Sequence, residues 1–334
     1  MQNLSSTMTA VVPQGLGLRP RLGLADKPLP KLTPDDVLVK VHAASVNPKD
    51  WKLNASLAAI TSPLPTRAMP PVFGDDLAGV VVAAGSRVTE FSVGDAVYGM
   101  DMYLRTASLA QYARIARGRI AKMPPGLSFG EAASMPLAAL TALQGLVDKG
   151  GAGKGSQVLI IGASGGVGTF AVQIAHALEC EVTAVCSARN AALVTALGAD
   201  QVVDYTQVDI HQLPHQYDIV FDVTSFETPA KCRSLLKPGG RFVSTGGYPG
   251  AVMGVLLNRR VDAQFVWVRS NTQDLQTLAR MVEQGQLKPI IDSRFPLADA
   301  QGAYDRSRSG RARGKIVIEV CEENQEIAGV ARGC

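Results

Sequence analysis

The sequence predicts an α/β protein with a doubly wound parallel sheet and a second domain that is rich in β-strands. Three observations lead to this prediction. The chain has 334 residues, enough for about two domains. A glycine-rich turn joins a short apolar segment at 158–161 to an amphipathic segment at 166–178. Short apolar runs separated by Gly and Pro occupy 8–125 and return after 289, which is typical of β structure.

In the first part of the chain, Gly and Pro separate strands expected at 37–46, 77–84 and 96–99. The pattern changes near residue 126. Ser128 and Glu131 have the spacing of a capping box, in which Ser accepts from the N3 amide while Glu reaches back. The composition that follows favours a helix over 132–149.

The central part of the chain alternates between strands and helices. Strands are expected at 158–161, 181–186, 201–203, 219–223, 241–244 and 263–268, with helices at 166–178 and 191–197. Such alternation indicates βαβ units and therefore a parallel sheet. From about 289 a helix at 298–307 and a strand at 315–320 suggest that the tail completes the first domain. The expected domain limits are 1–126, 127–270 and 271–334.

Composition excludes several classes of function. The net charge of +4 is too mild for a nucleic-acid-binding protein, and no apolar run approaches the ~20 residues that span a membrane. Five scattered cysteines, none spaced C-x-x-C, favour reduced thiols and a cytoplasmic location. The N-terminus lacks the basic and apolar regions of a signal peptide.

The glycine-rich turn is the main functional motif. Gly162-Ala-Ser-Gly-Gly-Val-Gly168 follows a strand and opens a helix, which is the context of a dinucleotide-binding fingerprint with Ala163 in its first glycine position. Gly165 would let the backbone approach a pyrophosphate, and Gly168 would let the helix pack closely on the strand. The simpler alternative is a packing turn that binds no ligand.

An acid that usually follows this fingerprint is missing. NAD-binding chains carry Asp or Glu about 20 residues on, to accept from the adenosine ribose 2′-OH. Here Ser187 occupies that region and Arg189 follows. A hydroxyl and a guanidinium would bind a 2′-phosphate, so the site favours NADPH. Alternatively, Arg189 is a solvated residue that precedes a helix capped by Asn190.

Seven segments, taken together and in this order, resemble the medium-chain dehydrogenase/reductase superfamily, and within it the zinc-free quinone oxidoreductases. They are VHAASVNPKDWK (41–52), PPVFGDDLAGVV (70–81), EAASMPLAALTA (131–142), GASGGVGTFAVQ (162–173), LGADQVVDY (197–205), LKPGGRFVSTGG (236–247) and SGRARGKIVIEV (309–320). The likeness is strongest to the reticulon-interacting mitochondrial oxidoreductases and their bacterial relatives. It implies a GroES-like catalytic domain built from both chain ends, a Rossmann domain between them, and an active site in the cleft.

The resemblance also implies roles for individual residues. Pyrophosphate would contact Ser164, Gly165, Gly166 and Val167. The 2′-phosphate would bind Ser187 and Arg189, and Tyr205 would lie near the adenosine. Thr224, Gly246 and Gly247 would line the nicotinamide path. Asn47 would lie near the nicotinamide and substrate, and Lys52 near the ribose hydroxyls. Asn47 has a structural alternative, which is to cap the turn before Pro48, and Lys52 could simply be solvated.

No metal site is expected. Ser45 and Val46 stand where zinc-dependent relatives carry a catalytic Cys, and Gly74-Asp-Asp76 replaces their G-H-E motif. With no Cys before 180, neither zinc site of those enzymes can be built in the usual way. His211 and His215 have i, i+4 spacing, but Pro214 lies between them, so we interpret them as loop residues.

These features favour zinc-independent, NADPH-dependent reduction of a quinone or an α,β-unsaturated carbonyl, a small-molecule acceptor. Without zinc, alcohol oxidation loses its Lewis acid, whereas hydride addition to a conjugated system spreads the charge onto an oxygen. Two alternatives stay open: a trans-acting enoyl-thioester reductase of a biosynthetic pathway, and an NADPH-binding regulatory or structural protein with little turnover. The resemblance implies a homodimer paired through the strand at 263–268, with Val266 donating at the open edge. A monomer is the alternative if a helix at 273–285 covers that edge.

Overall fold

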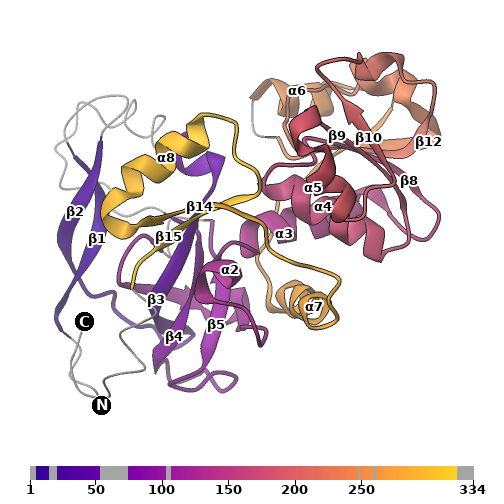
Figure 1. Ribbon diagram of the computed structural model, residues 1–334. Helices are drawn as coiled ribbons and strands as arrows, with labels where there is room; N and C mark the ends of the chain where they lie inside the picture. Colours follow the sequence, from indigo (N-terminus) through magenta and orange to yellow (C-terminus); the bar gives the residue numbers. More distant parts are fainter. Residues whose placement is uncertain are drawn as a thin grey trace. The chain divides into compact units, whose positions relative to one another are not determined.

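The computed structural model describes residues 5–14, 21–52, 74–102, 107–246, 249–258 and 261–321. The chain forms two compact units (Figure 1). Unit 1 comprises residues 1–137, 270–279 and 291–334, and unit 2 comprises 138–269 and 280–290. Unit 1 therefore contains both ends of the chain. It extends to Leu137 rather than to the expected limit at 126, since the short helix before this residue packs on the strands of unit 1.

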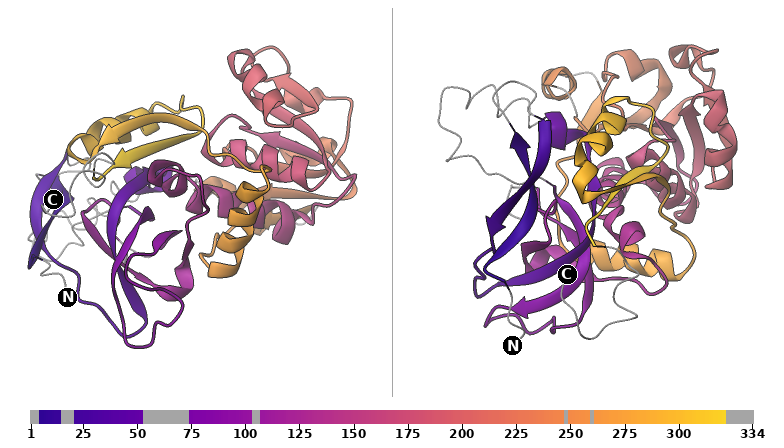
Figure 2. Two further views of the ribbon diagram at one scale, coloured as in Figure 1. Left: turned by 60° about the horizontal axis from the view of Figure 1, so that its bottom comes forward. Right: turned by 60° about the vertical axis from the view of Figure 1, so that its left-hand side comes forward.

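Unit 1 is built mainly of β-strands (Figures 1 and 2). Its larger sheet has the order β14-β15-β3-β4-β5-β7, with β6 paired to β3, and a separate hairpin joins β1 to β2. The strands are β1 (Thr7–Gln14), β2 (Arg21–Pro28), β3 (Asp36–Val46), β4 (Asp76–Ala84), β5 (Ala96–Met100), β6 (Tyr112–Ala116), β7 (Ile120–Lys122), β14 (Ile291–Pro296) and β15 (Lys315–Glu319). The tail strands β14 and β15 join this sheet, as the sequence predicted, beside the helix α8 (Ala300–Arg308).

The core of unit 1 explains why these segments form strands. Val37, Val39 and Val41 alternate along β3 and are fully buried, and they pack with Leu77 and Val81 of β4. Alternation with period two directs one face of a strand into a core. The expected strands at 37–46, 77–84 and 96–99 are therefore confirmed to within two residues at each end.

The predicted helix over 132–149 is wrong in its continuity. The capping box at Ser128 and Glu131 forms in full and starts α2 (Phe129–Ala133). The chain then restarts as α3 (Pro136–Gln144) and continues as a π-helical turn, η3 (Gly145–Gly150). The break occurs because Pro136 lacks the N–H that a continuous helix needs, and proline is favoured at the first position of a new helix.

Unit 2 contains a six-stranded sheet in which every neighbouring pair is parallel, in the order β10-β9-β8-β11-β12-β13. The strands are β8 (Gln157–Ile161), β9 (Glu181–Cys186), β10 (Gln201–Asp204), β11 (Tyr217–Asp222), β12 (Leu236–Ser244) and β13 (Asp262–Phe265). The helices include α4 (Gly166–Ala177), α5 (Ala191–Ala196) and α6 (Pro249–Leu257).

Both faces of this sheet are covered. On one face, Leu159, Val220 and Phe242 pack with residues of the connections that follow β10, β11 and β12. On the other face, Gly145 of η3 approaches the ring of Phe221 closely. This arrangement confirms the predicted doubly wound parallel sheet. The last strand is shorter than expected, since β13 ends at Phe265 rather than at 268.

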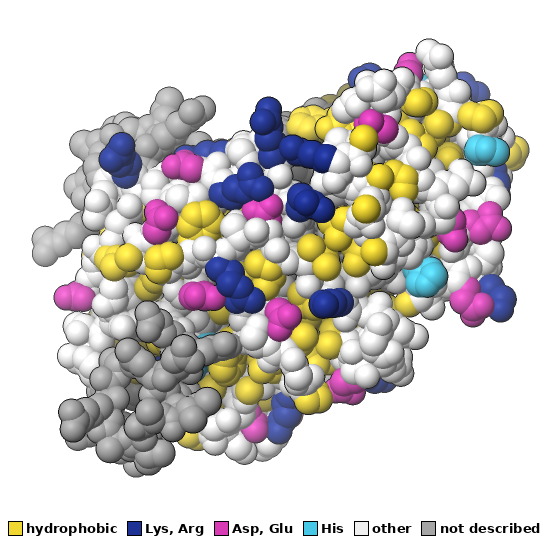
Figure 3. Space-filling model, in the orientation of Figure 1, with side chains coloured by type: hydrophobic (Ala, Val, Ile, Leu, Met, Phe, Trp, Pro, Cys, Tyr) yellow, Lys and Arg dark blue, Asp and Glu magenta, His cyan; other side chains and the backbone are white. Residues whose placement is uncertain are grey.

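The surface carries charges of both signs. On the face drawn in Figure 3, basic side chains are accompanied by acidic ones. On α8, for example, Arg306 pairs with Asp292 and Arg308 with Asp305. Among the described residues, no helix is long and apolar enough to span a membrane.

Candidate active site

The predicted cofactor residues of unit 2 follow the carboxyl ends of neighbouring strands. The turn at 162–168 follows β8, Ser187 follows β9, Tyr205 follows β10, Thr224 follows β11 and Gly246 lies just after β12. Because all these strands are parallel, their carboxyl ends share one edge of the sheet. The strand order reverses between β8 and β11, and ligands of open α/β sheets bind at such a switch point.

The glycine-rich turn is shaped by close approaches. Gly162 has φ of +88°, and a Cβ there would lie 2.5 Å from Thr224 Cγ2. A Cβ on Gly168 would lie 2.2 Å from the Gly162 carbonyl oxygen, so glycine lets α4 pack against the turn. At Gly165, the N-cap of α4, a Cβ would meet only the Gly162 oxygen at 3.4 Å. The start of α4 is therefore open, and its free N–H groups fit a dinucleotide pyrophosphate.

Asn190 links two of the predicted cofactor residues. Its Nδ2 donates to Ser164 Oγ at 2.9 Å and to Ser187 Oγ at 3.3 Å. The side chain does not cap α5, contrary to the alternative raised for this position. Asn190 is 5% exposed. A residue expected only as a helix cap therefore connects the residues expected to contact pyrophosphate and 2′-phosphate.

Arg189 is exposed beside Ser187 in a short 3₁₀ turn. Its guanidinium forms no ion pair with any carboxylate in the described part of the chain. Asp204, at the end of the neighbouring strand β10, is turned towards the backbone instead. Its Oδ1 accepts from the Thr206 N–H and hydroxyl, and these bonds lower the pKa of Asp204. Arg189 is thus left available to an anionic ligand.

On the other side of the switch point, Asp222 shapes the chain after β11. Its Oδ1 accepts from Thr224 N and Oγ1, at 2.9 and 2.6 Å, and its Oδ2 accepts from Glu227 N at 2.9 Å. Gly246 has φ of +62° and lies against the Phe265 ring. Tyr205 is 60% exposed, and Gly247 lies outside the described residues.

Unit 1 contains a buried polar cluster around Asn47. Asp76 Oδ2 accepts from Ser45 Oγ at 2.6 Å and from Asn47 Nδ2 at 2.8 Å. Lys315 Nζ donates to Asn47 Oδ1 at 2.6 Å and lies 3.5 Å from Asp76 Oδ2. All four side chains are at most 3% exposed. The pairing of β15 and β4 with β3 brings them together at the ends of three adjacent strands.

The cluster fixes how the Asn47 amide lies. The carbonyl oxygen of the amide accepts from the Lys315 ammonium, and its nitrogen donates to the Asp76 carboxylate. A flipped amide would place its nitrogen against the ammonium, another donor, and its oxygen against the carboxylate, another acceptor. One N–H of the amide has no partner among the described residues. The side chain of Asn47 therefore bonds Asp76 and Lys315 rather than capping the turn before Pro48. Within that turn the Asp50 carboxylate accepts from the Asn47 backbone N–H.

The sequence did not reveal the lysine that contacts Asn47, and the ribose role expected for Lys52 stays a prediction. Lys52 has its ammonium 5.5 Å from the ring centroid of Trp51. Lys315 binds Asn47 instead, and sequence reasoning missed it although it lies inside one of the seven motif segments. A lysine at the start of a strand carries no local signal, because only the tertiary pairing of β15 with β3 reveals its partner.

A second group of buried acids lies beside this cluster. Lys49 Nζ is 2.5 Å from Asp75 Oδ2. Burial raises the pKa of Asp50 to about 6, although Lys49 and the Asn47 N–H oppose the rise. Burial and the Asp50 charge also raise the pKa of Asp75. Burial and these two acids raise the pKa of Tyr304, whose hydroxyl has no partner among the described residues.

Comparison with known proteins agrees with this architecture. Residues 33–172 match the family described as "Alcohol dehydrogenase GroES-like domain", and residues 197–318 match the family described as "Zinc-binding dehydrogenase". The structure of the quinone oxidoreductase from Coxiella burnetii is similar, with a TM-score of 0.84 and 30% identity. The match covers 94% of this chain and all of that one.

Two plant enzymes are similar in sequence. The chain is 36% identical over 304 residues to the 2-methylene-furan-3-one reductase of Solanum lycopersicum. This alignment covers 87% of this chain and 73% of that protein. The chain is 34% identical over 304 residues to the chloroplastic NADPH-dependent alkenal/one oxidoreductase of Arabidopsis thaliana, with the same shares of the two chains. The chain is therefore an oxidoreductase that belongs to the medium-chain dehydrogenase/reductase superfamily, in its quinone oxidoreductase branch.

Proposed function

We propose that the protein reduces a quinone or an α,β-unsaturated carbonyl with NADPH and without a catalytic metal. The observation that carries this proposal is the composition of the Asn47 cluster. In zinc-dependent relatives this region supplies thiolate and imidazole ligands, whereas here Ser45, Asn47, Asp76 and Lys315 hydrogen-bond one another. A set of hydrogen-bonding groups suits a reaction in which a carbonyl oxygen becomes anionic.

A nicotinamide cofactor is implied by the family, and NADPH rather than NADH is our proposal. It rests on Ser187 and on the guanidinium of Arg189, which pairs with no carboxylate of the described residues; both groups suit a 2′-phosphate. The open start of α4 suits the pyrophosphate. The bound cofactor supplies the hydride. We assign Thr224, Gly246 and Gly247 to the nicotinamide path and Tyr205 to the adenosine side.

We assign a different role in the reaction to each of the unit 1 residues. The free N–H of Asn47 donates to the acceptor oxygen as negative charge develops there, while Asp76 and Lys315 hold the amide in the donating orientation. Removing one such donor typically costs about 10²–10³-fold in kcat. Lys52 is assigned to the cofactor ribose. Reduction of an enone needs a proton as well as a hydride, and we assign no side chain to that proton.

The test is NADPH oxidation by the purified protein against quinones, enones, alkenals and enoyl thioesters. Turnover of quinones or enones that falls about 10²-fold in Asn47→Ala supports the proposal. Preference for thioesters identifies a trans-acting enoyl reductase. Tight NADPH binding without consumption by any acceptor identifies a regulatory or structural protein, and either of these two results rejects the proposal.

We further propose that the protein is a homodimer and is cytoplasmic. β13 lies at one end of the sheet, and the side chains of Met253, Leu256, Leu257 and Trp267 near it are more than half exposed. An apolar edge of this kind is suited to pairing with a second copy. The cytoplasmic location rests on the reduced thiols of the buried cysteines at 180, 186 and 232.

A further inference from the structure

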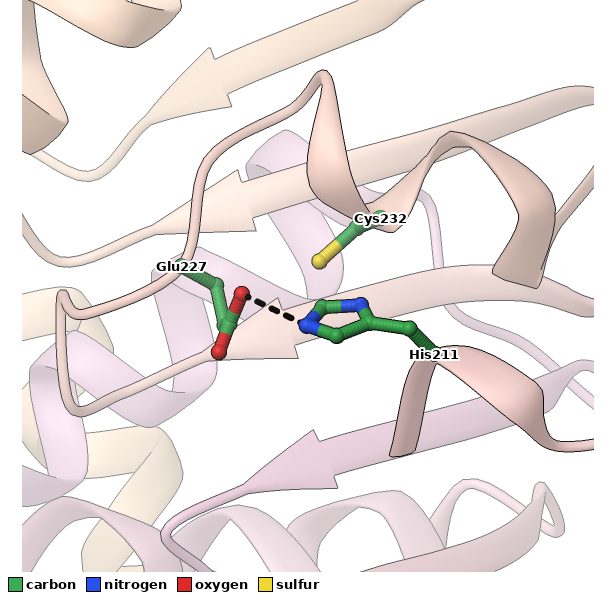
Figure 4. A group of neighbouring side chains, drawn as sticks. All are labelled: His211, Glu227 and Cys232. Atoms are coloured by element: carbon green, nitrogen blue, oxygen red, sulfur yellow. Dashed lines mark ion pairs between the residues drawn. The ribbon is translucent and has the colours of Figure 1, made fainter. Parts of the chain in front are cut away.

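A group of potential metal ligands lies in unit 2 and shares no residue with those assigned to the cofactor. It contains His211 of the short 3₁₀ turn η5 (Ile210–Gln212), Glu227 of the loop after β11, and Cys232 of η6 (Lys231–Leu235). One donor atom from each side chain lies within 4.8 Å of the other two. Figure 4 shows the three side chains pointing towards one another from three separate segments.

His211 and Glu227 form an ion pair whose geometry is compatible with two ligands of one metal ion. His211 Nε2 and Glu227 Oε2 are 3.3 Å apart, yet this oxygen has no hydrogen-bond partner among the described residues, so the two groups are poorly aligned. Lone pairs that point to a common third position produce such misalignment. Tetrahedral zinc with bonds of about 2.0–2.1 Å to nitrogen and oxygen separates those ligands by about 3.3 Å.

Cys232 provides a second, independent observation. Its side chain is 0% exposed, and its thiol forms no hydrogen bond within the described part of the chain. A buried free cysteine is ordinarily a small core residue, and Cys232 does contact the apolar core of this face. It differs from an ordinary core cysteine because its sulfur faces an imidazole and a carboxylate. His211 Nδ1 is also buried without a partner in the described residues.

The backbone holds the three segments in place without help from a ligand. Glu227 N donates to Asp222 Oδ2 at 2.9 Å, and His211 N donates to Asp209 Oδ1 at 3.0 Å. Cys232 N donates to the Thr228 carbonyl at 3.1 Å. The site is therefore largely preformed, and binding requires only a small inward movement of the side chains.

We propose that His211, Glu227 and Cys232 bind a divalent cation of the zinc class, with water completing four-fold coordination. One nitrogen, one oxygen and one sulfur donor match zinc chemistry, whereas magnesium and calcium select oxygen ligands. The side chains of His211 and Glu227 are 29% and 16% exposed, so the site lies close to the surface. The sequence predicted no metal here because His211 was judged only against His215, while Glu227 and Cys232 are brought in by the fold.

The experiment uses the full chain, stripped with a chelator and dialysed, and titrated with Co²⁺ as a spectroscopic probe of the zinc site. We expect thiolate-to-cobalt charge-transfer absorption that saturates at one equivalent and is displaced by Zn²⁺. Cys232→Ala should abolish the absorption, and His211→Gln or Glu227→Gln should weaken binding by at least about tenfold. His215→Ala is the matched control, because it removes an exposed histidine of the same loop, and should bind like the parent.

Two results would overturn the proposal: no charge-transfer absorption in the parent protein, or absorption that survives in Cys232→Ala. If Cys232→Ala fails to fold, His211→Gln and Glu227→Gln decide, because both side chains are partly exposed. Circular dichroism establishes that these variants are folded. Parent-like cobalt affinity in both would then reject the site.

Discussion

Lys315 Nζ lies 2.6 Å from Asn47 Oδ1, although the two residues are 268 positions apart in the chain. The same ammonium lies 3.5 Å from Asp76 Oδ2, which accepts from the other end of the Asn47 amide. Lys315 therefore acts on Asn47 from both sides. It binds the carbonyl oxygen directly, and it balances the carboxylate that holds the nitrogen.

Lys315→Met should lower kcat by about 10²-fold while changing the KM for NADPH little, because it misplaces the Asn47 amide and not the cofactor turn. It should also destabilise the protein by about 3–5 kcal/mol, since it leaves a buried carboxylate without its cation. Lys49→Met is the matched control, as it removes a lysine paired with the buried Asp75. A parent-like kcat in folded Lys315→Met would contradict the positioning role.

Arg189→Ala should weaken NADPH binding by about ten- to hundredfold and leave NADH binding unchanged. Charge-assisted hydrogen bonds to the 2′-phosphate contribute about 1.5–3 kcal/mol, and NADH lacks that group. Fluorescence titration of both cofactors measures the two affinities. Arg233→Ala, which removes another exposed arginine of unit 2, should have no effect. Equal affinities of the parent protein for the two cofactors would refute the preference.

Asp50→Asn should stabilise the protein at neutral pH. The folded-state pKa of about 6 exceeds the ordinary value of 3.8, so the folded protein holds more protons between these values and its stability falls as pH rises through them. The difference corresponds to about 3 kcal/mol at most. Asn keeps an oxygen for the Asn47 N–H. In thermal unfolding from pH 4.5 to 7.5, the stability of the variant relative to the parent should increase with pH. Parallel curves would mean that Asp50 titrates normally.

Tyr304→Phe should stabilise the protein by about 1–3 kcal/mol. The Tyr304 hydroxyl is buried without a partner among the described residues, and an unsatisfied buried hydroxyl costs that amount. The ring would still fill its place in the core of unit 1. Denaturant unfolding with an unchanged m-value measures the gain. A loss of stability would reveal a hydrogen bond that the hydroxyl makes through water.

Ala263→Pro should shift the proposed dimer towards monomer. Val266 N donates to the Ser244 carbonyl within the sheet, so the sequence-based choice of Val266 as the donor at the open edge was wrong. Donors alternate along a strand, and those of Ala263 and Phe265 therefore face outward. Light scattering should give about twice the chain mass of 35.2 kDa for the parent. A parent mass near that of one chain would exclude the dimer.

Local patterns in the sequence were sufficient to predict much of the fold. The capping box at Ser128, the turn at 162–168 and the strand positions depend on residues within a few positions of one another, so patterns reveal them. Lys315, Asn190 and Cys232 were missed because their partners lie on other strands or loops. The break before Pro136 was missed because the residues on both sides favour a helix, and this composition outweighed the single proline in the prediction.

Asn190 has a consequence for how cofactor affinity can change. One amide nitrogen serves both Ser164 and Ser187, so the contact expected at the pyrophosphate and the contact expected at the 2′-phosphate share a single donor. Free energies measured for Ser164→Ala and Ser187→Ala should therefore fail to add, since each substitution releases the amide to the serine that remains. If the proposed NADPH preference holds, selectivity for the 2′-phosphate and overall cofactor affinity should be thermodynamically coupled, and a mutational path that alters one of them should also change the other.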